Sequence, residues 1–125
     1  METQQKVKGF ITGEKAFSWT VDVRKCVATS RCDLGMRDQI SRAAASVSAN
    51  IAEGSGHHHP GDQARFYSIA RGSLAETVVG LRLLAAEGHV APAEFASLSS
   101  RAEEVRLLLG GLIRSSYARR TQSAR

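Results

Sequence analysis

The stretch Asp38–Gly56, DQISRAAASVSANIAEGSG, constrains the fold most, because its apolar residues are short and recur at helical spacing. The residues that share one helix face are Ile40, Ala43, Ala44, Val47 and Ile51. Alanine side chains let helices approach one another to about 8–10 Å. Gly54 and Gly56 follow, and glycine accepts the left-handed conformation that ends many helices. The stretch predicts a closely packed central helix that stops at these glycines.

Helical periodicity continues on both sides of this stretch. The predicted helices cover about residues 13–29, 34–53, 62–87 and 92–117. Together they form one domain over 13–118. Residues 1–12 show no clear period and are predicted to be a loose arm, and residues 119–125 are predicted to be a basic tail. We therefore predict an all-α chain, folded as an antiparallel up-down-up-down four-helix bundle.

The residues at the predicted helix ends agree with this division. Asp33 is a candidate cap for the second helix, and Pro92 lies near the first turn of the fourth, where its missing N–H costs no hydrogen bond. Gly88 is predicted to end the third helix. Within that helix Gly72 and Gly80 each cost about 1 kcal/mol relative to alanine. Their spacing puts them near one side, which suggests a close helix approach there.

The chain has more apolar residues than a single bundle can bury. The predicted first helix has an apolar face made of Phe17, Val21, Val23, Cys26 and Val27. Trp19 lies slightly off this face, in the core or in a seam between subunits. The fourth helix carries an a/d-like seam of Phe95, Leu98, Ala102, Val105, Leu109, Leu112 and Ser116. The apolar residues outside that seam are Leu107, Leu108 and Ile113. Exposed apolar groups usually mark partner surfaces, so self-association is predicted.

Composition and charge narrow the class of protein. The chain has 125 residues, and no apolar run reaches the roughly 20 residues that span a bilayer. The N-terminus lacks the apolar segment of a secretion signal, and two cysteines fit a small reduced protein, so a cytoplasmic location without membrane contact is predicted. The formal net charge is +5. From Gly111 onward the chain has arginines and no acid: Arg114, Arg119, Arg120 and Arg125. This basic end is either a phosphate-binding surface or a solvated terminus.

The residues that could perform chemistry give little support for an enzyme. His57, His58 and His59 are weak metal candidates, with Asp62 as a further oxygen ligand, because consecutive loop residues point in different directions. Cys26 has no histidine or basic partner in its helix, which argues against a nucleophile. No phosphate-binding glycine loop occurs. The sequence predicts a non-enzymatic protein without a cofactor.

A polar row is predicted beside the apolar stripe of the central helix. Its members, with their counterparts on the third helix, are Arg42, Ser46, Asn50, Glu53, Ser73 and Glu76. The row is either a binding or acid–base cluster or, as we favour, a buried hydrogen-bond network that fixes the register of the helices. If it is buried, replacing Asn50 or Glu53 by alanine is expected to cost about 1–3 kcal/mol of stability.

Two blocks of the sequence resemble a known family. QISRAAASVSANIAEGSG, followed by FYSIARGSLAETVVGLRLLA, is similar to the bacterial four helix bundle proteins, also called 23S rRNA intervening-sequence proteins. The likeness extends more weakly from about Phe10 to Tyr117. The chain departs from the family in having Gly13 where a tryptophan is usual, in lacking a Phe-Pro turn before the second helix, and in having His57–His59 where basic residues are common.

The resemblance implies a ring-forming bundle, usually a pentamer. A relative of the family, the accessory protein of diversity-generating retroelements, looks like a basic pentameric barrel that binds a reverse transcriptase and nucleic acid. We therefore expect a homo-oligomer that binds RNA or DNA through the arginines of the basic end. The alternative is a scaffold that recruits a protein partner such as a reverse transcriptase.

Overall fold

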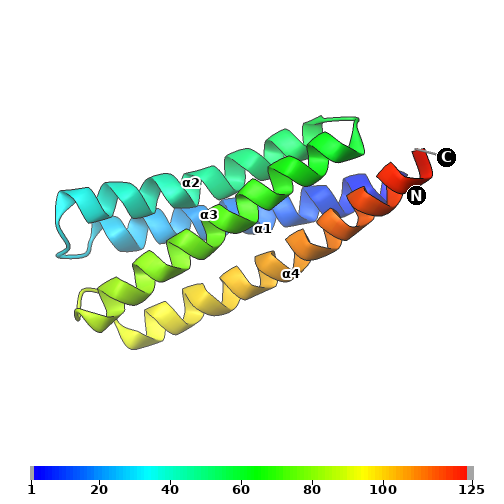
Figure 1. Cartoon of the computed structure of the whole chain (residues 1–125). Helices are drawn as coiled ribbons and strands as arrows, with labels where there is room; N and C mark the ends of the chain where they lie inside the picture. Colours follow the sequence, from blue (N-terminus) through cyan, green and yellow to red (C-terminus); the bar gives the residue numbers. More distant parts are fainter. Residues whose placement is uncertain (1, 124–125) are drawn as a thin grey trace.

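Four helices follow one another along the chain and alternate in direction (Figure 1). The structure is a computed structural model and describes residues 2–123. The helices are α1 (Glu2–Ala28), α2 (Leu34–Gly56), α3 (Pro60–Ala86) and α4 (Pro92–Ser123). No strand occurs within the described residues. The prediction of an all-α chain with four helices is confirmed.

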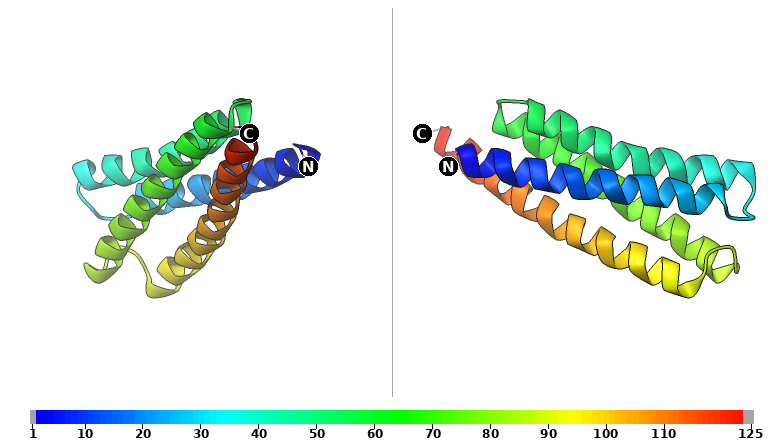
Figure 2. Two further views of the ribbon diagram at one scale, coloured as in Figure 1. Left: turned by 45° about the vertical axis from the view of Figure 1, so that its right-hand side comes forward. Right: turned by 180° about the vertical axis from the view of Figure 1, so that it is seen from behind.

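The helices enclose the core in cyclic order, with α1 and α3 each packed against both α2 and α4. The two ends of the bundle differ in the loops and chain termini that they contain (Figure 2). Both chain termini and the α2–α3 loop lie at one end, which we call the terminal end (Figure 1). The α1–α2 and α3–α4 loops lie at the other, which we call the two-loop end.

The loose arm predicted for residues 1–12 is wrong for the residues described, because α1 begins at Glu2. Gly9 and Thr12 are buried, so this segment has packing contacts that stabilise its helix. A Cβ atom at Gly9 would lie 3.0 Å from Ser55 Oγ of α2. Thr12 donates its hydroxyl hydrogen bond to the Lys8 carbonyl at 2.7 Å. The contact between Gly9 and Ser55 joins α1 to α2, and therefore no local sequence period marks it.

Helix α2 ends at Gly56, as its two glycines predict, but neither glycine is left-handed. Gly54 and Gly56 both lie inside α2, whose C-cap is His57 in an extended conformation with φ −88°. Gly54 is buried against α3, where a Cβ atom would lie 2.7 Å from Tyr67 Cε1. The glycine at position 54 is therefore required by a helix–helix contact rather than by a turn.

Capping at the two-loop end follows the predictions. The Asp33 side chain accepts a hydrogen bond from the Met36 N–H at 2.9 Å, which caps α2. Gly88 has φ +80° and ends α3. Its N–H donates to the Ala85 carbonyl, and the His89 N–H donates to the Leu84 carbonyl at 2.8 Å, the pattern of a Schellman motif.

The apolar stripe of α2 faces the core as predicted. All five of its members are buried: Ile40, Ala43, Ala44, Val47 and Ile51. Most of the predicted α4 seam is buried as well, namely Leu98, Ala102, Val105, Leu109, Leu112 and Ser116. Phe95 is half-buried against this core. The helical spacing of apolar residues therefore identified the inner faces of both helices.

The predicted apolar face of α1 is confirmed in part, because Val23, Cys26 and Val27 are buried. Trp19 is fully buried, and its indole N–H donates to the Leu98 carbonyl at 3.0 Å, so it belongs to the core and ties α1 to α4. Phe17 was assigned to the buried face but is 60% exposed. Trp19 takes the inward position because the largest side chain of α1 buries the most apolar surface there.

The two glycines in the interior of α3 differ. A Cβ atom at Gly80 would lie 2.6 Å from Ile40 Cγ1, which confirms a close approach of α2 and α3. Gly72 is exposed and has nothing within 4 Å of a Cβ position, so no close approach occurs there. Only one of the two therefore has a packing reason to be glycine.

Helix α4 extends beyond its predicted end. It continues to Ser123, so the predicted tail over 119–125 is helical as far as it is described. Arg125 lies outside the described residues. Outside the seam, Leu107 is 59% exposed as expected, whereas Ile113 is buried. In the described part of the chain no helix combines the length and apolarity that a membrane span requires.

Candidate functional site

A groove of about 510 Å³ opens at the terminal end of the bundle. It lies along the N-terminal half of α1 and the C-terminal half of α2, and the α2–α3 loop and Arg119 of α4 border it. Gly9 and Gly13 of α1 face this space. Because Gly13 carries no side chain, α1 leaves the groove unfilled beside Ile51.

Polar atoms of α2 and α3 line the floor of the groove. The hydroxyl groups of Ser55 and Tyr67 form a hydrogen bond of 3.1 Å. Tyr67 is buried, and its ring contacts Gly54. The wall formed by α1 is different, because Phe10 and Phe17 are 68% and 60% exposed. The groove therefore combines exposed aromatic rings with fixed hydroxyl groups.

Cationic side chains border the same groove. Lys6 lines it from α1 and Arg119 from α4, while Glu14 is the acidic residue among its lining. The Arg119 guanidinium donates to Gln63 Oε1 at 2.6 Å, and a longer contact of 3.4 Å reaches Ser116 Oγ. Its Nε is buried without a hydrogen-bond partner within the described residues. Gln63 thus holds Arg119 at the groove without neutralising its charge.

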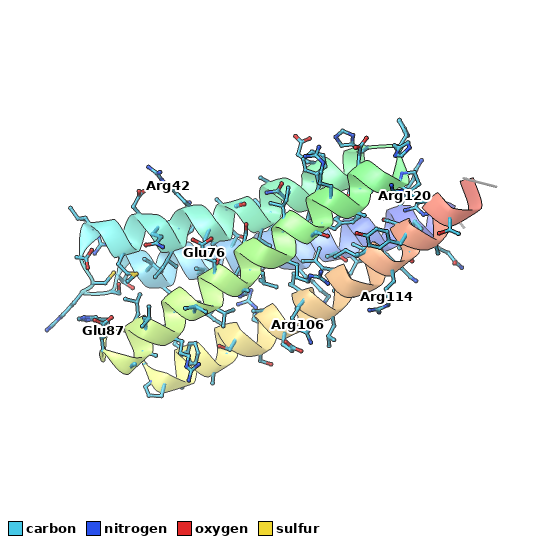
Figure 3. The ribbon with its side chains drawn as sticks, viewed as in Figure 1. Arg42, Glu76, Glu87, Arg106, Arg114 and Arg120 are labelled. Carbon is cyan, nitrogen blue, oxygen red and sulfur yellow. The ribbon has the colours of Figure 1, made fainter. Side chains whose placement is uncertain are left out.

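Arg114 and Arg120, the other described arginines of the basic end, lie on the same helix as Arg119. Arg120 is exposed, and its Cδ lies 3.9 Å from the Cβ position of Gly61, at the start of α3. Arg114 is exposed and folds back over Gly110. Figure 3 shows Arg114 and Arg120 on the part of α4 nearest the chain termini. Among the described residues none of these three arginines forms an ion pair with an acid.

The predicted polar row is only partly a network. Ser46 Oγ and Ser73 Oγ lie 2.8 Å apart and link α2 to α3. The Asn50 amide donates to the Ser46 carbonyl at 2.8 Å and to Ser46 Oγ at 3.0 Å. These three side chains are half-buried and satisfy one another. This contact is of the kind that fixes the register of α2 against α3.

The charged members of the row lie outside this network, contrary to the prediction of a buried row. Arg42 pairs with Asp38 on its own helix at 3.0 Å, and both side chains are exposed. Glu53 is exposed and lies 3.7 Å from His57 Nε2. Glu76 is exposed at the edge of a shallow depression that Arg42 also lines (Figure 3). Helical spacing placed these residues on one side of α2 and α3 but could not determine their depth.

The three histidines occupy separate positions. The His57 ring stacks on Phe66 with centroids 4.9 Å apart. His58 lines the groove, and His59 Nδ1 accepts a hydrogen bond from the Gly61 N–H to cap α3. Within the residues described, no three His, Cys, Asp or Glu side chains converge as they would around a metal ion. The imidazoles therefore do not form one ligand set.

Cys26 lies at the two-loop end, far along α1 from the groove. Burial, followed by a hydrogen bond to Glu94 and the charge of that carboxylate, raises the pKa of its thiol to about 12. A thiol with this pKa stays protonated near neutral pH and is a poor nucleophile. The weak nucleophile interpretation made from the sequence therefore gains no support from its environment.

The sequence did not single out the groove. Lys6, Phe10 and Tyr67 were not predicted as site residues, and Phe17 was placed in the core. A usable signal was present, because Phe10, Gly13 and Phe17 recur at helical spacing. The predicted first helix began at residue 13 and therefore did not include Phe10.

Comparison with known proteins gives a family and a fold. The family model described as 23S rRNA-intervening sequence protein matches residues 10–111. A protein of unknown function from the S23 ribosomal protein family of Bacteroides thetaiotaomicron VPI-5482, with a crystal structure at 1.70 Å resolution, is similar with a TM-score of 0.79. The two are 24% identical over 86% of this chain and 98% of that one, which supports a shared fold.

A search among curated proteins finds no match. The matched segment contains Phe10, Phe17 and the polar network, whereas Arg114, Arg119 and Arg120 lie beyond its end. It covers most of the chain and both sequence blocks on which the resemblance was based. This chain therefore belongs to the 23S rRNA-intervening sequence protein family.

Proposed function

We propose that this protein is a non-enzymatic binding protein for nucleic acid, RNA or DNA, and that it acts in the cytoplasm as a homo-oligomer. The observation that carries the proposal is the set of unpaired cations at the terminal end of the bundle. Arg114, Arg119 and Arg120 lie there on one helix, and Lys6 of α1 lines the same groove as Arg119. Among the residues described, no ion pair neutralises them.

Such a cluster suits a polyanion. Each phosphate that a cation neutralises releases condensed counterions, so binding becomes favourable and strongly dependent on salt. Arginine also reaches phosphate oxygens through two parallel N–H donors. The chain's net charge of +5 favours the approach of nucleic acid at longer range.

The proposed assembly is a ring, with a pentamer as the first expectation from the family. Its support is the apolar surface that one bundle leaves uncovered on α3, where Val79 is 58% and Leu83 47% exposed beside a shallow apolar depression. A ring would also repeat the basic end in every subunit, which raises the effective concentration of binding sites. Light scattering on the whole chain measures the subunit number.

The test compares two triple variants of equal charge. Arg114, Arg119 and Arg120 are replaced by glutamine in one, and the exposed Arg31, Arg71 and Arg82 in the control. We measure affinity for a short mixed-sequence RNA as a function of salt. The first variant is expected to weaken binding and to reduce the salt dependence by up to about three counterions, whereas the control keeps most of both. Equal losses in the two variants would refute the assigned interface.

The second candidate function is a scaffold that recruits a protein such as a reverse transcriptase. The exposed apolar residues of α3 are the observation that favours it. The two functions respond differently to nuclease. A complex with a purified reverse transcriptase that survives nuclease treatment, and that is lost in Val79→Asp, supports the scaffold. Loss of the complex on nuclease treatment supports direct binding of nucleic acid.

A further inference from the structure

The groove at the terminal end has two exposed aromatic rings that do not belong to the core of the bundle. Phe10 and Phe17 are seven residues apart on α1 and therefore share a face, about 10 Å apart along the helix axis. More than half of each side chain is exposed. Between them Gly13 contributes no side chain, so the space beside both rings stays open.

The same groove presents cations close to these rings. Lys6 lies four residues before Phe10 on α1 and lines the groove beside it. Arg119 borders the space from α4, held by its hydrogen bond to Gln63, with its Nε unpartnered within the described chain. Tyr67 and Ser55 add hydroxyl groups that both donate and accept hydrogen bonds.

We propose that this groove binds single-stranded nucleic acid, with bases stacked on Phe10 and Phe17 and phosphates held by Lys6 and Arg119. The inference rests on the proposed function and specifies its ligand and its site. Aromatic platforms beside a basic track are the features that bind single strands without strict sequence preference. Bases in a duplex are stacked on one another, so a duplex can meet the cations of this groove but not its rings.

Charge separates a nucleic acid from the other occupants of an aromatic groove. A symmetric contact of this groove with the same groove of a second copy would bring Lys6 and Arg119 of both copies together and bury like charges. A polyanion neutralises both residues, and its bases cover the exposed rings. The combination of aromatic and cationic groups therefore favours a single strand over self-association at this surface.

The test uses the full chain and one mixed-sequence RNA, presented as a single strand and as a blunt duplex. The double variant Phe10→Ala/Phe17→Ala is expected to lose at least tenfold in affinity for the single strand, with little change for the duplex. The salt dependence of both complexes should stay as in the parent protein, because no charge is removed. Leu107→Ala, which removes an exposed apolar side chain outside the groove, is the matched control and should bind like the parent.

Two further variants separate stacking from simple apolar contact. Phe17→Trp keeps an aromatic plane and should retain or improve single-strand affinity, whereas Phe17→Leu keeps an apolar side chain without the plane and should lose affinity. Lys6→Gln should reduce the salt dependence of single-strand binding by about one counterion. Circular dichroism of each variant checks that the helices are intact.

The outcomes distinguish this inference from the proposed function. If the parent protein binds neither RNA, the proposed function fails and the groove inference fails with it. If the arginine variants weaken binding but both phenylalanine substitutions leave single-strand affinity unchanged, the proposed function stands and the groove inference is overturned. A lower native mass in the double variant would instead show that a second copy covers the rings, which also overturns it.

Discussion

The terminal end and the two-loop end of this bundle are built from the same four helices but differ in how tightly their side chains pack. At the two-loop end Asp33 and Gly88 cap the helices, Gly80 packs directly on Ile40, and the Cys26 thiol is buried. At the terminal end an open groove carries exposed phenylalanines and unpaired cations. The contrast suggests that the two-loop half supplies stability and that the terminal half is available for a ligand.

The largest expected difference compares two aromatic residues of α1. Trp19→Ala should destabilise the protein by about 3–5 kcal/mol, because it empties a fully buried site and removes the hydrogen bond to Leu98. Phe17→Ala should change stability by less than about 0.5 kcal/mol, because the ring is mostly exposed. Urea unfolding followed by circular dichroism measures both. A large cost for Phe17→Ala would mean that the groove wall is part of the core.

The next comparison uses the glycines of the two halves. Gly80→Ala should cost about 1–3 kcal/mol, because the new methyl group meets Ile40 inside the core. Gly54→Ala makes a similar overlap with Tyr67, yet should cost less, because that ring borders the groove and can move into it. Gly72→Ala is the control and should stabilise by up to about 1 kcal/mol, since nothing opposes its methyl group. Equal costs at positions 54 and 80 would contradict looser packing at the terminal end.

The sequence predicted the parts of the fold that depend on local pattern. Helical spacing identified the inner faces of α2 and α4, and capping chemistry identified Asp33 and Gly88. The failures share one cause, which is contact between residues distant in the chain. Gly54 looked like a helix stop because its partner Tyr67 comes later in the sequence. Residues 1–12 looked loose because Gly9 packs against Ser55.

The candidate site was less predictable than the fold, for the same physical reason. Its cations come from opposite ends of the chain, with Lys6 on α1 and Arg119 on α4. No spacing rule connects such residues until the bundle places both helices at one end. The basic character of the end could be predicted from composition, whereas the aromatic groove beside it depends on α1 burying Trp19 and leaving Phe10 and Phe17 exposed.

A pH comparison tests burial at the two-loop end. The pKa of Cys26 is raised from 9.0 to about 12 in the folded protein, so the native state binds this proton more tightly than the unfolded chain. The resulting stability is complete below pH 9 and is lost as the pH rises towards 12. Between pH 8 and pH 10 the parent should therefore lose up to about 1.4 kcal/mol more than Cys26→Ala. Parallel curves for the two proteins would show that the thiol is accessible to solvent.

The smallest expected difference is in the stability cost of two substitutions in the polar row, Asn50→Ala and Glu53→Ala. Asn50→Ala should cost about 1 kcal/mol, because two hydrogen bonds to Ser46 are lost while the helix preference of alanine returns part of the energy. Glu53→Ala, one turn nearer the terminal end, should stay within about 0.5 kcal/mol, since its side chain is exposed and lies 3.7 Å from an exposed histidine. Thermal unfolding of both variants at neutral pH makes the comparison. A cost for Glu53→Ala that matches Asn50→Ala would mean that the row is buried along its whole length. A partner, whether a second copy or a nucleic acid, would then have to cover Glu53. Binding of that partner would contribute part of the stability of the terminal end.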